Sequence, residues 1–170
     1  MPMPLTADAN SVLELAQAGA NEAALAIATL LKISSARVAL VETIADEALA
    51  SRHGPRALVV GFTISGALQG RFAVVTSEAH AKALAHELVT FKGEGLPKKA
   101  LGALTELGNI GASAYLNGIA DMVQSSCVPS VPSCTIDDAA TAIRAVLGPS
   151  LLVARVSAGP HELDLALSLP

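Results

Sequence analysis

An acid and a carboxamide, Glu106 and Asn109, lie three positions apart in a segment that otherwise has the periodicity of an apolar helix. Side chains at i and i+3 share one helix face. A merely solvated helix usually carries Lys and Glu on its wet face, so an uncharged polar stripe favours recognition or catalysis. Ordinary solvated side chains would give the same spacing. The stripe also contains Gly102, Ser113 and Asn117, and the opposite face, which we expect to be buried, contains Leu101, Leu104, Gly108, Ala112 and Tyr115.

An internal repeat places a similar pattern earlier in the chain. Glu14 aligns with Glu106 without a gap, at an offset of 92 residues, the difference between positions 106 and 14. An offset of more than half the chain favours two related halves over a solenoid array. Glycine inside a helix costs about 1 kcal/mol relative to alanine, so the matched glycines Gly19 and Gly111 predict close helix packing. The other matches are Leu15 with Leu107, Ala20 with Ala112, Ile27 with Ile119 and Ala28 with Ala120.

Hydrophobic periodicity and capping residues predict the helices that position these side chains. Residues 92–96, with two glycines, join the two halves. The expected helices are 8–32, with Asp8, Asn10 or Ser11 as N-cap; 78 to about 91, with Ser77 as N-cap; one with Pro97 in its first turn; and one beginning near Asp137.

The remaining segments have the composition of strands and hairpins. The order of elements in the second half repeats that of the first. We therefore expect an α+β fold with a pseudo-twofold internal repeat, in which long helices pack outside an antiparallel sheet. The chain 1–170 is interpreted as one domain of two repeats, about 8–91 and 97–168. The predicted extended segments are 33–43, 57–64, 71–75, 125–135, 151–156 and 162–168.

Composition excludes several classes of function. With 52% hydrophobic and 2% aromatic residues and no Trp, the core must consist of Ala, Leu, Val and Ile. A net charge of -4 opposes nucleic-acid binding, which needs a basic surface. No uninterrupted apolar run reaches the roughly 18 residues of a membrane span, and no signal-type segment is present. We expect a cytoplasmic protein without membrane insertion.

Cysteines and histidines give no metal or redox motif. Cys127 and Cys134 lack CxxC spacing and are interpreted as buried or partly buried free thiols. The histidines lack ligand spacing such as HExxH and are expected at the surface or in loops. No protein-bound metal is predicted. The histidines are His53, His80, His86 and His161.

The segment ELGNIGASAYLNGIADM, followed by VPSVPSCTIDDAATAI, resembles the CheC, CheX and FliY phosphatases of chemotaxis, and CheC most closely. The motif of that family is Ser or Asp, three residues, Glu, two residues, Asn, twenty-two residues and Pro. Glu106, Asn109 and Pro132 match it in order and spacing. The resemblance covers essentially the whole chain, because ELAQAGANEAALAIATLLKI is similar to the first helix of a two-site CheC.

The sequence departs from the family motif at three positions. Gly102 stands where the family has Ser or Asp. In the first repeat Glu14 is present, but Gln17 replaces Asn and Leu40 stands at the position of Pro. The extra methylene of Gln adds a rotor that must be frozen. We therefore expect a degenerate first site and most of the activity in the second repeat.

The resemblance implies a phosphatase for the aspartyl phosphate of a CheY-type response regulator. The Mg2+ ion and a Lys that neutralise the phosphoryl group would belong to that receiver domain, and this chain would bind no cofactor. Asn109 would position the attacking water, since one planar amide holds both a donor and an acceptor. Glu106 would bind the receiver's Lys.

Two other interpretations remain open. A non-catalytic CheC-like adaptor would bind a response regulator or the deamidase CheD without altering phosphate lifetime. In CheC proteins the helix that corresponds to the one expected to begin near Asp137 takes part in binding CheD. Asp137 and Asp138 therefore form a candidate partner surface. A flagellar-switch or structural relative is disfavoured because no assembly domain is appended.

Overall fold

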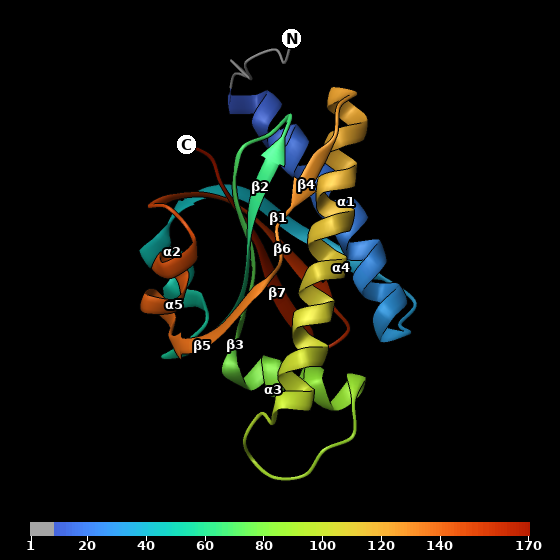
Figure 1. Ribbon diagram of the computed structural model, residues 1–170, viewed down its shortest axis with the longest axis vertical. Coiled ribbons are helices and arrows are strands. Elements are labelled where there is room, and N and C mark those ends of the chain that lie inside the picture. The colour runs from blue at the N-terminus through green and yellow to red at the C-terminus, as the bar shows by residue number, and fades with distance from the viewer. Residues whose placement is uncertain (1–8) are drawn as a thin grey trace.

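The computed structural model describes residues 9–170, which form an antiparallel sheet covered by helices (Figure 1). The elements in chain order are α1 (Ala9–Leu31), β1 (Ala36–Ala45), α2 (Asp46–Arg52), β2 (Arg56–Gly66), β3 (Gly70–Ser77), α3 (Glu78–Leu88), α4 (Lys98–Val123), β4 (Cys127–Pro129), β5 (Ser133–Asp138), α5 (Ala139–Val146), β6 (Ser150–Ala158) and β7 (His161–Ser168).

The order of strands is symmetric about the centre of the sheet, where β3 pairs with β7. On one side β7 is followed by β6 and β1, and on the other β3 is followed by β2, which pairs with both β4 and β5. The strand after each long helix thus pairs with the hairpin of the other half. The expected antiparallel α+β fold with a pseudo-twofold repeat is confirmed.

Side chains alternate along each strand and divide the core between the two faces of the sheet. Along β2, Leu58 and Val60 join the larger cluster, to which α1, α3 and α4 contribute. Ala57 and Val59 point the other way and join the smaller cluster with α2 and α5. Figure 1 shows α1 and α4 on one side of the sheet and the short helices α2 and α5 on the other. The helices pack outside the sheet, as predicted.

Glycines bring α1 and α4 to within backbone contact of each other. A Cβ at Gly19 would lie 2.9 Å from the carbonyl oxygen of Tyr115, and one at Gly118 would lie 2.8 Å from that of Ala18. The prediction of close packing is confirmed for Gly19. It is wrong for Gly111, where a Cβ would meet its nearest neighbour at an ordinary 3.6 Å. The helices cross, and Gly111 lies about two turns before the crossing point, so Gly118 provides the close approach instead.

Local signals at α3 agree with the structure, whereas α2 was not expected. The Ser77 hydroxyl caps α3 by accepting a hydrogen bond from the amide of His80 at 3.1 Å. The helix ends at Leu88, before the expected end near residue 91, because Val89 is extended. α2 has only 7 residues, too few for a clear hydrophobic period. The acids in its first turn are the signal that could have revealed it.

Two other capping predictions are wrong or untested. Asn10 and Ser11 lie within α1, so neither is its N-cap, and Asp8 lies outside the described residues. Pro97 is the N-cap residue of α4 and not part of its first turn. Its missing N–H costs nothing there, because the first amides of a helix have no intrahelical acceptor.

Two histidines are buried. His53 lies in the turn after α2, as a loop position predicts, whereas His161 lies in β7, so for His161 the prediction of a surface or loop position is wrong. His53 is 4% exposed, and its Nε2 lies 2.6 Å from Oδ2 of the fully buried Asp164. Arg52 Nη1 lies 3.6 Å from the other oxygen of that carboxylate. His161 is also 4% exposed and is hydrogen-bonded to Glu87 at 2.6 Å. Buried polar side chains need such partners, and the fold brings these together from distant parts of the chain.

Cys127 and Cys134 are free thiols, buried and half-buried respectively, as predicted. Within residues 9–170, no group of three or more His, Cys, Asp and Glu side chains is arranged to hold a metal ion. In the same part of the chain, no helix has the length and apolar character needed to cross a membrane.

Candidate functional site

The polar stripe of α4 faces outward. Glu106 is exposed and Asn109 is half-buried, while Asn117 is exposed further along the helix. The opposite face is buried at Leu104, Gly108, Ala112 and Tyr115, as predicted, but Leu101 is only half-buried. In the described part of the chain, neither the Glu106 carboxylate nor the Asn109 amide makes a hydrogen bond or ion pair within the protein. Both groups are therefore available to a partner.

Strand β5, which follows Pro132, lies beside α4. Pro132 occupies the turn between β4 and β5, and the Cys134 thiol, two residues later, lies beside the Thr105 side chain of α4. Burial raises the pKa of Cys134, and its interaction with the Thr105 side chain lowers it less, so the thiol stays protonated. The Thr105 hydroxyl donates its proton to the carbonyl of Leu101 at 2.7 Å. The structure thus brings the Pro132 segment to the helix of Glu106. Thr105 was missed because a threonine within a helix has no distinctive sequence pattern.

The corresponding residues of the first repeat lie on a separate helix, α1, and differ in their contacts. Glu14 and Gln17 are exposed, but Gln17 Nε2 donates to Asn21 Oδ1 at 2.9 Å. Leu40 is 48% exposed and lies in β1, which continues to pair with β6 after a register shift between Val38 and Leu40. The carboxamide of the first repeat is thus partly engaged within its own helix, unlike that of Asn109.

Gly102 lies one turn before Glu106, at an open position on the exposed face of α4. A Cβ at this glycine would have no neighbour within 4 Å. The backbone is helical there, so a side chain would be accommodated without strain. Packing therefore does not explain why the position is glycine.

Comparison with known proteins identifies the fold. No protein-family model and no curated protein matches the sequence. Among solved structures, FliY from Thermotoga maritima has a TM-score of 0.72 at 14% identity, over 94% of this chain and 88% of the other. A chain of the CheX-CheY-BeF3-Mg+2 complex from Borrelia burgdorferi has a TM-score of 0.66 at 12% identity, over 92% and 98%. The chain has the CheC/CheX/FliY fold.

The same fold also occurs in a complex of FliG and FliM. A chain of the FliG-FliM complex from H. pylori has a TM-score of 0.66 at 9% identity, over 94% of this chain and 91% of the other. The resemblance inferred from the sequence motif is thus confirmed for the fold. All these identities are low, so the comparisons show the fold and leave the chemistry of α4 to its own side chains.

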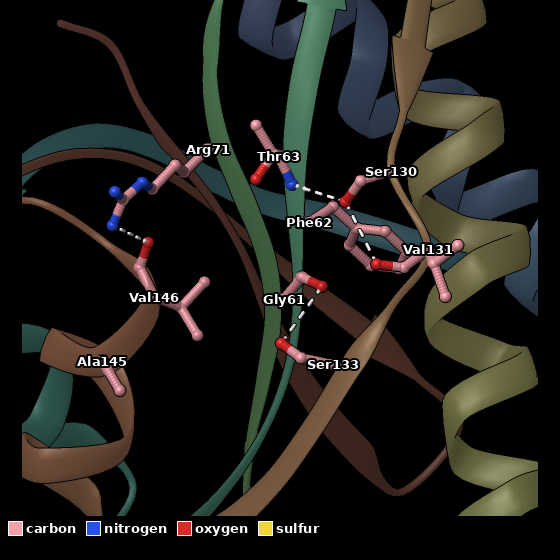
Figure 2. A pocket seen from close by; sticks show the side chains of 9 residues that line it. All are labelled: Gly61, Phe62, Thr63, Arg71, Ser130, Val131, Ser133, Ala145 and Val146. Carbon is pink, nitrogen blue, oxygen red and sulfur yellow. Dashed lines mark hydrogen bonds between the residues drawn. The ribbon is translucent and has the colours of Figure 1, made fainter.

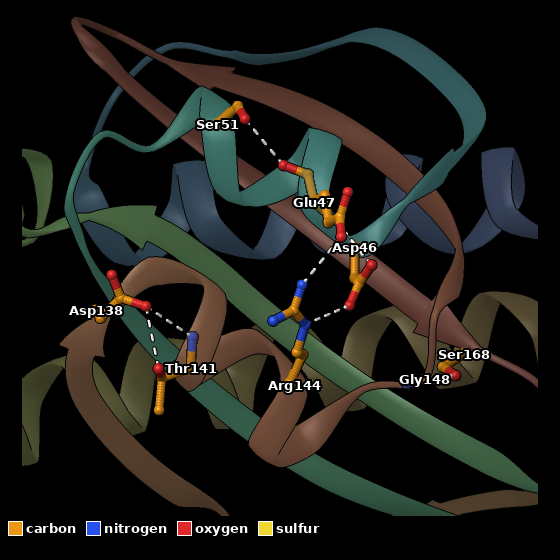
Figure 3. A network of polar contacts seen from close by, with 8 residues as sticks. All are labelled: Asp46, Glu47, Ser51, Asp138, Thr141, Arg144, Gly148 and Ser168. Atoms are coloured by element: carbon orange, nitrogen blue, oxygen red, sulfur yellow. Dashed lines mark hydrogen bonds and ion pairs between the residues drawn. The ribbon is translucent and has the colours of Figure 1, made fainter.

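Asp137 and Asp138, the candidate partner surface, stabilise the start of α5. Asp138 is its N-cap and accepts hydrogen bonds from the Thr141 amide at 3.1 Å and the Thr141 hydroxyl at 3.0 Å (Figure 3). Asp137 Oδ1 accepts from the amide of Asp138 at 2.7 Å. Both carboxylates are exposed but bonded locally. A capping role accounts for these acids without a partner.

An ion-pair network joins α5 to α2 across the two halves. Arg144 Nε donates to Asp46 Oδ2 at 3.0 Å, and its Nη2 donates to Glu47 Oε1 at 3.3 Å (Figure 3). These bonds raise the pKa of Arg144, so it stays charged. Asp46 is offset by 92 residues from Asp138. Equivalent acids thus begin the two short helices.

The capping role of Asp138 predicts a pH dependence of stability. The bonds from the Thr141 amide and hydroxyl lower the pKa of Asp138 below its ordinary value. A carboxylate whose pKa is lower in the folded state stabilises above its unfolded pKa, and this contribution is lost as pH falls through the folded pKa. Asp138→Asn keeps an acceptor oxygen but no charge.

We expect wild type to be more stable than Asp138→Asn near neutral pH, and the difference to shrink below about pH 4. Urea denaturation midpoints of both proteins, measured across that range, test this. A difference that is independent of pH would contradict a charged cap.

Proposed function

We propose that this chain binds the phosphorylated receiver domain of a CheY-type response regulator and accelerates hydrolysis of its aspartyl phosphate, in cytoplasmic chemotaxis or motility signalling. The observation that carries the proposal is the free pair on α4. Glu106 and Asn109 share the outward face, match the family motif with Pro132, and make no hydrogen bond within the described part of the protein.

Phosphoryl transfer needs mostly positioning and electrostatic stabilisation. The receiver domain supplies its own Mg2+ and Lys, which neutralise the phosphoryl group. The Asn109 amide accepts from and donates to the attacking water without taking its proton. Glu106, three residues earlier on the same face, pairs with the receiver's Lys and so sets the pose of Asn109. Half-burial of Asn109 restricts its rotamers before the receiver docks.

A receiver domain is the partner that the comparisons support. One similar structure is a CheX-CheY complex, and another contains FliM bound to FliG. The same fold therefore occurs in complexes with different partners. CheD is not supported by the comparisons, and the local hydrogen bonds of Asp137 and Asp138 leave no separate reason to propose it.

A second candidate function is a non-catalytic adaptor that binds the response regulator. The observation in its favour is Gly102, which leaves the first motif position, Ser or Asp in the family, without a side chain. The decay of aspartyl phosphate on candidate receiver domains separates the two. Faster decay supports the phosphatase. Measurable binding of the phosphorylated receiver without faster decay would move the protein to the adaptor class.

Gly102→Ser should raise the rate of dephosphorylation. The new side chain enters open space and restores the residue type of the family motif. One added neutral hydrogen bond contributes about 0.5–1.5 kcal/mol, which corresponds to roughly twofold to tenfold in rate. The measurement is phosphate decay at equal enzyme concentration, with Gly102→Ala as the control for helix stabilisation alone. An equal increase with Ala would rule out a role for the hydroxyl.

A further inference from the structure

A break in the edge of the sheet distinguishes the second half from the first. β4 pairs with β2 as far as Pro129 opposite Ile64, and β5 resumes with Ser133 opposite Gly61. The first half has no such break. Its equivalent of Val131, at an offset of 92 residues, is Ala39. Ala39 lies in the continuous strand β1, whose register only shifts between Val38 and Leu40. The interruption therefore occurs on one edge of the sheet only.

Ser130 compensates the backbone groups at this break. Its amide donates to the Thr63 carbonyl at 2.8 Å, and its hydroxyl accepts from the Thr63 amide at 2.9 Å. The hydroxyl also donates to the Val131 carbonyl at 3.1 Å. These bonds hold the loop in place without a strand, so the gap beside it is a fixed feature of the fold.

The break opens into a groove of about 320 Å³, at the lower end of ligand-binding pockets, which span roughly 300–1,000 Å³. Figure 2 shows the loop residues Ser130 and Val131 on one side of β2, and Ala145 and Val146 of α5 on the other. Gly61 of β2 forms the floor of the groove and allows α5 to approach the strand closely. A Cβ at this position would lie 2.5 Å from Val146 Cγ1.

Among the described residues that line this groove, Arg71 is the one cation, and none is an acid. Arg71 is exposed and lies opposite Thr63 in the β2–β3 ladder, so their side chains are neighbours on one face. Arg71 Nη1 donates to the Val146 carbonyl at 3.2 Å, which leaves four of its five N–H groups. Within residues 9–170, Arg71 has no ion-pair partner and the Thr63 hydroxyl has no hydrogen bond.

An apolar contact lies across the groove from this cation. Val131 is 88% exposed, the highest value among the exposed large hydrophobic side chains of the described residues. Such a side chain on a loop held by Ser130 presents a fixed aliphatic surface. A ligand for this groove therefore needs a carboxylate for Arg71 and an aliphatic side chain for Val131.

We propose that the groove is a docking site for an acidic segment of a protein partner, in which one carboxylate pairs with Arg71 and an aliphatic side chain a short distance away packs on Val131. Charge complementarity carries the choice of occupant, since a planar guanidinium binds carboxylates through paired N–H groups. The proposal does not depend on the phosphatase activity proposed for α4.

The test uses the full chain and three synthetic probes: Ac-Leu-Gly-Asp-Gly-NH2, its Asn counterpart, and Ac-Gly-Gly-Asp-Gly-NH2. Amide and Arg71 side-chain chemical shifts are followed during titration. We expect the first probe to shift resonances of Thr63, Arg71 and Val131 with a Kd on the order of 1 mM. The Asn and Gly probes should bind at least about tenfold more weakly, a change of about 1.4 kcal/mol.

Matched variants separate the groove from nonspecific charge effects. Arg71→Gln and Val131→Ser should each abolish the shifts, whereas Arg37→Gln, which removes another exposed arginine, on β1, should not. The Val131 side chain is almost fully exposed and does not pack in the core, so Val131→Ser should fold. The proposal is overturned if no probe binds, if Arg71→Gln binds unchanged, or if acetate and inorganic phosphate bind as well as the first peptide.

Discussion

Asn109→Ala is expected to abolish the acceleration of aspartyl-phosphate hydrolysis, with a loss of at least about 100-fold, or some 2.7 kcal/mol of transition-state stabilisation. The alanine removes the amide that we propose positions the attacking water. Holding a nucleophile in a productive pose can supply several kcal/mol, so no other single group on this face should cost as much. Within residues 9–170 the half-buried Asn109 side chain has no hydrogen bond, so stability should change little.

Two carboxamides serve as controls. Asn117→Ala removes the same side chain from an exposed position two turns further along α4. Gln17→Ala tests the first repeat, where the amide is bonded to Asn21. Both variants should keep most of the activity in a phosphate-decay assay with the same receiver domain. Loss with Gln17→Ala alone would place the working site in the first repeat, against our assignment.

Gly118→Ala is expected to lower the free energy of unfolding by about 1–3 kcal/mol, although alanine is the better helix former. Its Cβ would lie 2.8 Å from the Ala18 carbonyl oxygen and 3.1 Å from Gly19 Cα, so α1 would have to move away from α4. Backbone atoms cannot rotate aside as a flexible side chain can. The strain should therefore exceed the gain in helix propensity.

Two glycines of the same helix provide the matched comparison. Gly102→Ala enters open space and should stabilise the protein by up to about 1 kcal/mol, and Gly111→Ala meets only an ordinary contact at 3.6 Å. Urea denaturation of the three variants gives the comparison directly. For a chain of 170 residues, 1 kcal/mol corresponds to roughly 2–4 °C in Tm. Equal effects of all three substitutions would contradict the crossing geometry.

The sequence alone determined the elements with strong local signals. The periodicity of α4 separated its buried residues, such as Leu104 and Tyr115, from the outward stripe of Glu106 and Asn109. Alternation and turn residues located both hairpins, and Ser77 located the start of α3. The 92-residue offset and the motif ending in Pro132 led to the correct fold. These features are readable because each depends on residues a few positions apart, or on a spacing along the chain.

Only the tertiary structure decided the features that depend on contacts between distant segments. It paired β1 with the hairpin of the other half, buried His53 against Asp164, and made Gly118 the point of closest helix approach in place of Gly111. Among the residues that the structure describes, it also left the Asn109 amide without a hydrogen bond, whereas the Gln17 amide is bonded to Asn21. Local periodicity reports which face of an element is buried but not what covers it, because the covering residue comes from elsewhere in the chain.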